Sequence, residues 1–498
     1  MRITNKMMTN NMMSNINKNK VNLSKLDEQY STGKKIQRPS DDPIITVRAL
    51  KLRTNLSELE QYFGKNIPDA KSWMDVTESA LRTVNSILKQ VNTYCVQGST
   101  DTLTATDRSS IVENLRQLKD QIYHEGNTNY AGRYVFTGYK TDSSLIFTED
   151  TSNLSYQITE NISGKGIQVI NKVTGSYELS DFDNNATEDF SESPIMNDVY
   201  RLQLSYENLS DADLENIRIF KKNAAGQLEE QTPFDKIKTI SVTEEDAYLP
   251  ASDEAHFIPE TGEIILGSGA YEELRTADNM KITYSKTGFN NGDLKPEHYF
   301  DCVMTDNNKP EQEPITYTRT SQDIEYEVNY NQKLKVNTEG ADAITHQIGR
   351  AIDDILKTVN DVIKTEEKIK EVEKRLQDTT LSEDDVKRYN KLKEQLDTEL
   401  ELKKEAMQQA FSKGITSSSV EQDRVNTAVA DLGSRYVRLE LTENRLSNQK
   451  VDFEELLSEN EDADLTETII KFNAAATLYN ASLSAASKVV QNSLLDFL

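Results

Sequence analysis

The C-terminal stretch from Leu465 to Leu498 constrains the fold most, because it contains no Gly or Pro and carries a narrow apolar stripe. Its apolar residues alternate by three and four positions, which places them along one seam of a helix. This predicted seam consists of Ile469, Phe472, Ala476, Tyr479, Leu483, Ala486 and Val490. Asp464, with Glu467 three residues later, predicts a capping box, so we expect a helix that begins near Leu465. A helix with such a seam needs a partner helix.

The candidate partner is the opposite end of the chain. Residues 1–32 have a weaker helical stripe, in which apolar residues are diluted by many Asn. The residues of this stripe that we assign to the pairing seam are Ile16, Leu23, Leu26 and Tyr30. Such a segment is only marginally helical by itself in water. We therefore expect the two ends of the chain to pair, and we expect residues 1–37 and 464–498 to be flexible in the free monomer.

The segment from Ser31 to Pro43, STGKKIQRPSDDP, predicts a joint between two helices. Gly33 can end the first helix, and Pro39 interrupts any continuation. Asp41 or Asp42 can cap a second helix that has Pro43 in its first turn. Turn chemistry alone would favour an ordinary linker at this position.

The hydrophobic period changes along the chain and divides it into five parts. We assign residues 1–43 as an N-terminal assembly helix, which pairs with a C-terminal assembly helix at 460–498. Residues 44–139 are assigned as an N-terminal helical rod, and residues 341–459 as a C-terminal helical rod with a charged helical elaboration near 365–411. Between the two rods, residues 140–340 are assigned as an inserted β-rich outer domain. The predicted fold class is therefore α+β, with a long antiparallel helical coiled-coil rod built from both chain ends and a β-rich domain inserted between the helical halves.

Several local boundaries follow from the same pattern. Gly64 and Pro68 are expected to separate two helices, and a third helix is expected to be capped near Thr106 or Asp107. A helix from Ser382 to about Phe411 is expected to end in a loop at Gly414–Ser419. A second heptad then runs from Val425 to Leu457. The charged stretch contains three pairs of opposite charge spaced by four residues, which predict an exposed helical hairpin. The pairs are Glu366 with Lys370, Glu371 with Arg375, and Glu399 with Lys403.

The sequence contains no recognisable catalytic or cofactor motif. The four histidines are not spaced as metal ligands, and the phosphate-binding and nucleophile-elbow motifs are missing. Cys95 and Cys302 are expected to be free thiols, and Trp73 a packing residue. We therefore predict no catalytic residue, no cofactor and no metal site, although 83 Asp and Glu leave a paired-carboxylate site open. The net charge of −26 and the absence of a long apolar run argue against nucleic-acid binding and membrane insertion.

Four stretches of this chain resemble the flagellin family. They are STGKKIQRPSDDP at 31–43, NTNYAGRYVFTGY at 127–139, DLGSRYVRLE at 431–440, and the terminal segment that closes with SLLDFL. Within the family, RPSDDP, LSENEDADLTE and SLLDFL are more similar to subunits of the hook–filament junction than to those of the filament. The family motif falls on Gly33, Lys34, Arg38, Pro39, Asp41, Asp42 and Pro43.

The resemblance implies an extracellular structural subunit of the bacterial flagellum. It implies export in the unfolded state by the flagellar type III apparatus, without a cleaved signal peptide, and assembly as a ring between hook and filament. The implied partners are further copies of the chain, an adjacent hook-associated protein, flagellin, and an export chaperone that holds the C-terminal helix. The alternatives are a filament flagellin, an enzyme inserted into a flagellin frame, and a cytoplasmic coiled-coil scaffold.

Overall fold

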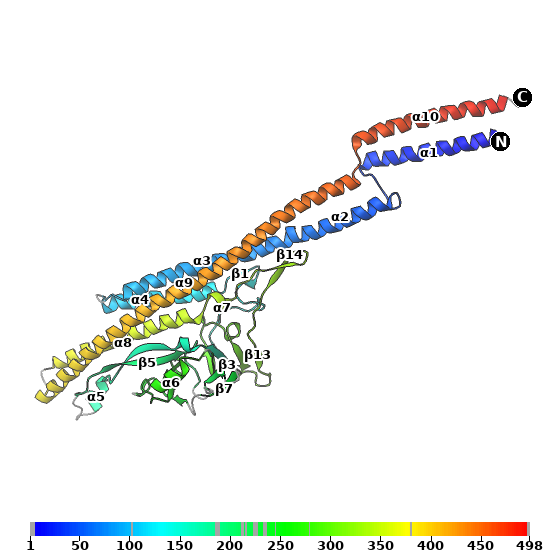
Figure 1. The fold of residues 1–498 in the computed structure, drawn as a ribbon. Coiled ribbons are helices and arrows are strands. Elements are labelled where there is room, and N and C mark those ends of the chain that lie inside the picture. Colours follow the sequence, from blue (N-terminus) through cyan, green and yellow to red (C-terminus); the bar gives the residue numbers. More distant parts are fainter. Residues whose placement is uncertain are drawn as a thin grey trace. The chain divides into compact units, whose positions relative to one another are not determined.

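The computed structural model describes residues 5–495 except 101–102, 185–189, 211–213, 215–216, 223–227, 233–236, 245, 278 and 379–380. It confirms the predicted α+β class, with long helices from both chain ends and antiparallel sheets between them (Figure 1). The chain forms two compact units. The first contains residues 1–70, 326–334 and 437–498, and the second contains 71–325 and 335–436.

The first unit is built mainly from helices. They are α1 (Asn5–Thr32), α2 (Pro43–Gln61), the π turn η1 (Tyr62–Asn66), the beginning of α3 (Ile67–Gly98), the C-terminal part of α9 (Glu383–Glu461) and α10 (Leu465–Leu495). A hairpin of β14 (Glu325–Asn329) and β15 (Gln332–Lys335) packs on these helices. Its contacts include hydrogen bonds, since Asn66 donates to the Glu327 carbonyl at 2.8 Å and Arg445 donates to Gln332 Oε1 at 3.0 Å.

The expected break between two helices at Gly64 and Pro68 is wrong. The helix continues from α2 into α3 through the π turn, in which the Ile67 N–H reaches back five residues to the Tyr62 carbonyl. A proline inside a helix lacks one N–H and crowds the carbonyl four residues before it. The wider π turn directly before Pro68 makes room for the proline ring, so the helix continues.

The helices of the second unit are α3, α4 (Ala105–Glu125), α8 (His346–Leu376) and the N-terminal part of α9. Thr104 caps α4 through a capping box with Asp107, two residues before the predicted start. The loop expected at Gly414–Ser419 is also wrong, because α9 runs uninterrupted through it. A β-carbon on Gly414 would lie 2.6 Å from Ile355 Cδ1 and 3.0 Å from Cys95 Sγ, so this glycine lets α3, α8 and α9 approach closely.

The β-rich region contains two larger sheets and a short hairpin. The six-stranded sheet has the order β13 (Ile315–Tyr317), β12 (Asp301–Asp306), β3 (Thr151–Ile162), β11 (Met280–Phe289), β6 (Arg218–Lys222), β7 (Leu228–Gln231). The five-stranded sheet has the order β4 (Gln168–Thr174), β5 (Ile195–Gln203), β10 (Glu263–Leu266), β9 (Ala255–Ile258), β8 (Lys238–Thr239). The hairpin pairs β1 (Asn129–Tyr130) with β2 (Arg133–Tyr134). The short helices are η2 (Gly164–Gly166), α5 (Leu179–Asn184), α6 (Ser268–Leu274), η3 (Pro296–His298) and α7 (Gly340–Ala343).

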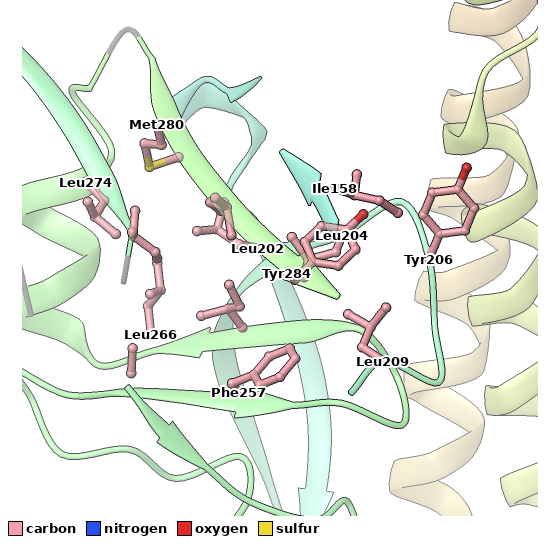
Figure 2. Packing of buried hydrophobic residues seen from close by; sticks show 14 of the residues in the cluster. Ile158, Leu202, Leu204, Tyr206, Leu209, Phe257, Leu266, Leu274, Met280 and Tyr284 are labelled. Carbon is pink, nitrogen blue, oxygen red and sulfur yellow. The ribbon is translucent and has the colours of Figure 1, made fainter. Parts of the chain in front are cut away.

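One hydrophobic core joins the two larger sheets. Residues that alternate along β3 and β11, such as Ile158 and Tyr284, meet side chains from the five-stranded sheet, such as Leu202 and Phe257 (Figure 2). All four are buried. Because successive side chains of a strand point to opposite faces, alternate residues of these strands form the faces that point into this core.

The charged helical hairpin is less exposed than its sequence suggests. Glu399 is fully buried, where it pairs with Lys403 and accepts a hydrogen bond from Thr365 at 3.3 Å. Glu366 forms its ion pair with the buried Arg108 of α4, at 2.9 Å. A segment of the β-rich region also covers the tip of the hairpin and packs its aromatic side chains there. The members of this cluster are Tyr177, Phe182, Phe190, Ile369, Val372, Tyr389, Leu392 and Leu396.

Candidate assembly site

Helices α1 and α10 from the two ends of the chain lie side by side and antiparallel (Figure 1). Two contacts fix their direction. The rings of Tyr30 and Phe472 stack with centroids 6.4 Å apart, and Asn19 Nδ2 donates to Ser482 Oγ at 2.9 Å. Moving back by eleven residues on α1 thus corresponds to moving forward by ten on α10, which defines one register for the pair.

The contact between α1 and α10 is narrow and contains few large apolar residues. Ile16 and Leu26 of α1 are buried, and Leu23 is half-buried. On α10 the most buried positions are Thr468 and Ala475. Because a large aliphatic side chain stabilises a fold by about 1.5–3 kcal/mol when it is fully buried, this seam provides little stabilisation for two helices of this length.

The predicted seam of α10 requires a correction. Ile469 and Leu483 remain 39% and 43% exposed, so a large part of each side chain lies outside the contact with α1. The less exposed positions of α10 are Thr468, Phe472, Ala475, Ala476, Tyr479, Ser482 and Ala486. Four positions, Phe472, Ala476, Tyr479 and Ala486, agree with the prediction, whereas Thr468, Ala475 and Ser482 each lie one residue before a predicted position. The side chain of Val490 lies outside the described part of the chain.

The one-residue shift leaves a second apolar stripe on α10. Leu465, Ile469 and Leu483 are spaced by multiples of a helical turn, lie next to the contact with α1, and are 50%, 39% and 43% exposed. Most exposed large hydrophobic side chains among the described residues belong to the first unit, although it is the smaller one. Exposed apolar side chains that follow one side of a helix are typical of a surface that binds a partner.

A short joint connects the α1–α10 pair to α2 and α9. Gly33 has a φ of +70°, a left-handed conformation that glycine adopts without strain. Its carbonyl accepts a hydrogen bond from the Ala463 N–H at 2.8 Å, and the Lys35 N–H donates to the Glu461 carbonyl at 2.7 Å. The turn after α1 and the break between α9 and α10 are therefore bonded to each other through the backbone.

Ion pairs reinforce the joint. Lys34 Nζ lies 2.5 Å from Asp462 Oδ1 and 3.5 Å from Glu461 Oε2. Arg53 Nη2 of α2 lies 2.6 Å from the same oxygen of Glu461, which is only 5% exposed. The hydrogen bond to Asp462 raises the pKa of Lys34, and the hydrogen bonds from Lys34 and Ser458 lower the pKa of Asp462. Sequence reasoning missed Glu461, because it lies within an acidic run that is typical of a solvated loop.

The remaining residues of the family motif form local turns. Asp41 Oδ2 accepts from the Arg38 N–H at 3.0 Å, and Asp42 Oδ1 caps α2 by accepting from the N–H groups of Ile44 and Ile45 at 3.0 and 3.1 Å. Pro43 occupies the first turn of α2, as predicted. The side chains of Arg38 and Pro39 are exposed, and no described contact gives them a role.

The described residues contain no arrangement suited to catalysis by a metal. No group of three or more His, Cys, Asp or Glu among them could hold a metal ion. Cys95 and Cys302 are free and buried, and burial raises the pKa of each thiol to about 12. Trp73 is fully buried in packing contacts, as expected. Among the helices of the described part of the chain, none is long and apolar enough to cross a membrane.

Both ends of the sequence match known family descriptions. Residues 3–141 match the bacterial flagellin N-terminal helical region, and residues 419–498 match the bacterial flagellin C-terminal helical region. Both terminal parts of the chain are therefore similar to the corresponding regions of bacterial flagellins. The resemblance to the flagellin family predicted from the motifs is confirmed, and the matched residues include α1, the joint and α10.

Curated relatives belong to the same group. The chain is 32% identical to flagellar hook-associated protein 3 of Salmonella typhimurium over 146 residues, which is 29% of this chain and 45% of the relative. It is 33% identical to the protein of the same name from Escherichia coli over 151 residues, 30% of this chain and 47% of the relative. A flagellin of Clostridium tyrobutyricum is 38% identical over 105 residues, 21% of this chain and 28% of the relative. The chain thus spans about half the length of the hook-associated relatives.

Solved structures with a weaker likeness include a flagellar hook-associated protein from Vibrio parahaemolyticus. It is 13% identical, with a TM-score of 0.38, and the comparison covers 85% of this chain and 100% of that one.

Proposed function

We propose that this chain is a structural subunit of the bacterial flagellum that assembles through α1 and α10 into the junction between hook and filament. The observation that carries the proposal is the antiparallel pair of chain ends, whose helix α10 has one apolar stripe against α1 and a second one exposed. A helix with two adjacent apolar stripes fits between two partner helices. Self-association in a ring would supply the second partner.

The proposed partners follow from the same helix. Leu465, Ile469 and Leu483 each gain about 1.5–3 kcal/mol only when another surface covers them. Further copies of the chain, the adjacent hook-associated protein and flagellin would cover this stripe after assembly, and an export chaperone would cover it beforehand. This arrangement suits export in the unfolded state, because a seam with so little buried apolar surface provides weak order to the free ends. The proposed location is the extracellular flagellum.

A filament flagellin is the second candidate function. The observation that favours it is the 38% identity to the Clostridium tyrobutyricum flagellin, which is higher than the identity to either hook-associated relative. That alignment is shorter, since it covers only 21% of this chain.

Gene deletion combined with electron microscopy and analysis of the medium tests the proposal. Without a junction subunit, we expect cells with intact hooks, no filaments, and flagellin released unassembled into the medium, all restored by a plasmid copy. If the chain were the filament subunit, the deletion would leave no major flagellin to be released. Long homofilaments formed by the purified protein alone would also contradict the junction assignment.

A further inference from the structure

His346 is the first residue of α8 and is enclosed by aromatic rings of the β-rich region. Its ring centroid lies 4.8 Å from that of Tyr206, 4.7 Å from that of Tyr299 and 5.3 Å from that of Phe300. The imidazole is buried, and Thr345 caps the helix directly before it. The contact therefore joins the first turn of a long helix to two separate segments that flank the sheets.

Nε2 of the buried His346 imidazole makes no hydrogen bond to any of the described residues that would stabilise an additional proton. The neighbouring hydroxyls are directed at backbone carbonyls, since Tyr206 donates to the Leu294 carbonyl and Tyr299 to the Ile344 carbonyl, both at 2.8 Å. A buried cation without a hydrogen-bond acceptor is costly, so the site is suited to a neutral ring.

The cations near this site add to that cost. Arg350 lies one turn further along α8 and donates to the Thr261 carbonyl at 2.5 Å, and Lys119 of α4 pairs with Asp353 at 2.7 Å. Burial, together with the positive charges of Arg350 and Lys119, lowers the pKa of His346 to about 3.

The carboxylates and the phenol in this region do not offset these charges. Glu207 is shared between Arg350 and Lys357, at 3.3 Å from each. Glu421 of α9 accepts from Thr345 Oγ1 at 3.0 Å, and burial raises its pKa. Burial likewise raises the pKa of Asp293 and that of Tyr123, so both groups are shifted toward their neutral forms.

We propose that His346 holds the β-rich region on α8 as a neutral ring and that acid releases this contact. The proposal concerns a conformational device in the body of the subunit, and it does not depend on how the chain ends assemble.

The direction of the pH dependence follows from linkage. An unperturbed histidine has a pKa of about 6.5, so this neutral contact contributes fully above that pH and is lost as the pH falls toward 3. Burial alone would raise the pKa of Glu207, but the charges of Lys357 and Arg350 lower it. The contribution of Glu207 to stability is therefore also lost as the pH falls. Glu207 is present in both the wild type and the His346 variants. A comparison between these proteins therefore measures the contribution of the imidazole alone.

Hydrogen exchange of the full-length chain tests the proposal. We expect the backbone amides of residues 346–352 to lose about 50-fold of their protection between pH 6.5 and 4.5, after correction for intrinsic exchange. The reason is that a released imidazole is half protonated at pH 6.5 and almost fully protonated at pH 4.5, whereas the enclosed ring stays neutral. His346→Phe keeps a ring of similar size without a titrating group, and its loss over the same range should be at least tenfold smaller. His124→Gln, at an exposed position of α4, serves as the matched control and should behave as the wild type.

Equal pH dependence in the wild type and in a folded His346→Phe variant would overturn the proposal. Should that variant fail to fold, NMR titration of the wild-type imidazoles gives an independent answer. We expect His346 to remain neutral down to pH 4.5, and a titration midpoint near 6.5 would overturn the proposal equally.

Discussion

Asn19 Nδ2 donates a hydrogen bond to Ser482 Oγ at 2.9 Å, although the two residues are 463 positions apart in the sequence. A polar pair within a helical seam costs stability but specifies one register and one orientation. The Tyr30–Phe472 stack agrees with that register near the opposite end of the contact. These two pairs account for why ends with so few large buried side chains still meet in a single arrangement.

The exposed stripe of α10 can be separated from its contact with α1 by mutation. Leu483→Asp should leave the α1–α10 contact intact, because Leu483 is 43% exposed in the chain. It should weaken association between subunits by at least about tenfold, since the burial of one Leu is worth about 1.5–3 kcal/mol. Sedimentation of assembled protein and motility would measure this effect.

Ala475→Asp is the matched variant on the other stripe, because Ala475 is only 9% exposed. It should disrupt the α1–α10 contact itself. Normal assembly and motility of Leu483→Asp would argue against an intersubunit role for the exposed stripe.

Two glycines of α9 should respond to alanine with opposite signs. Gly414→Ala should destabilise the second unit by about 1–3 kcal/mol, because the new β-carbon overlaps Ile355 and Cys95. Gly433→Ala should stabilise it by about 0.5–1 kcal/mol, because no atom lies within 4 Å and alanine is the better helix former. Urea unfolding followed by circular dichroism measures both. A stabilised Gly414→Ala variant would contradict the close helix packing described at this position.

The joint should have a defined pH range of stability. The lowered pKa of Asp462 means that its contribution is present above about pH 3.9 and is lost as the pH falls through the folded value. The raised pKa of Lys34 means that its contribution is present below about pH 10.4 and is lost as the pH rises further. We therefore expect a plateau between about pH 5 and 9.

Asp462→Asn should remove the acid limb of this profile, measured as amide protection of residues 33–36. The effect should stay within about 1 kcal/mol, because Asp462 is 42% exposed and solvent screens the pair. An acid limb of equal size in the variant would assign the effect to other groups.

The sequence predicted the pairing partner of α10 but not which of two adjacent stripes faces it. The predicted seam contains the apolar residues at 469, 472, 476, 479, 483 and 486, whereas the less exposed positions are 468, 472, 475, 476, 479, 482 and 486. The less exposed positions 468, 475 and 482 each lie one residue before a predicted position. Both sets have a heptad spacing, and the pattern favoured the set with the larger side chains. The structure selects the set that contains Ser482, because its hydroxyl has a partner on α1.

Two other differences have similar causes. Gly414 and the following serines indicate a loop by local propensity, but close packing with α3 and α8 keeps them helical. Glu461 gives no signal in the sequence, because its cations Lys34 and Arg53 become its neighbours only when the two chain ends meet. By contrast, the caps at Asp42 and Asp464 depend on adjacent residues alone and were predictable.

The most direct test of the paired chain ends is disulfide cross-linking between Asn19→Cys and Ser482→Cys in protein isolated from flagella. Mild oxidation should join the two positions efficiently, and mass spectrometry of peptides should identify the link. Asn17→Cys with Ser482→Cys is the matched control, because Asn17 is exposed on α1, and it should cross-link poorly. Absence of the 19–482 link, or equal yields for both pairs, would contradict the antiparallel pairing of α1 with α10 on which this account depends.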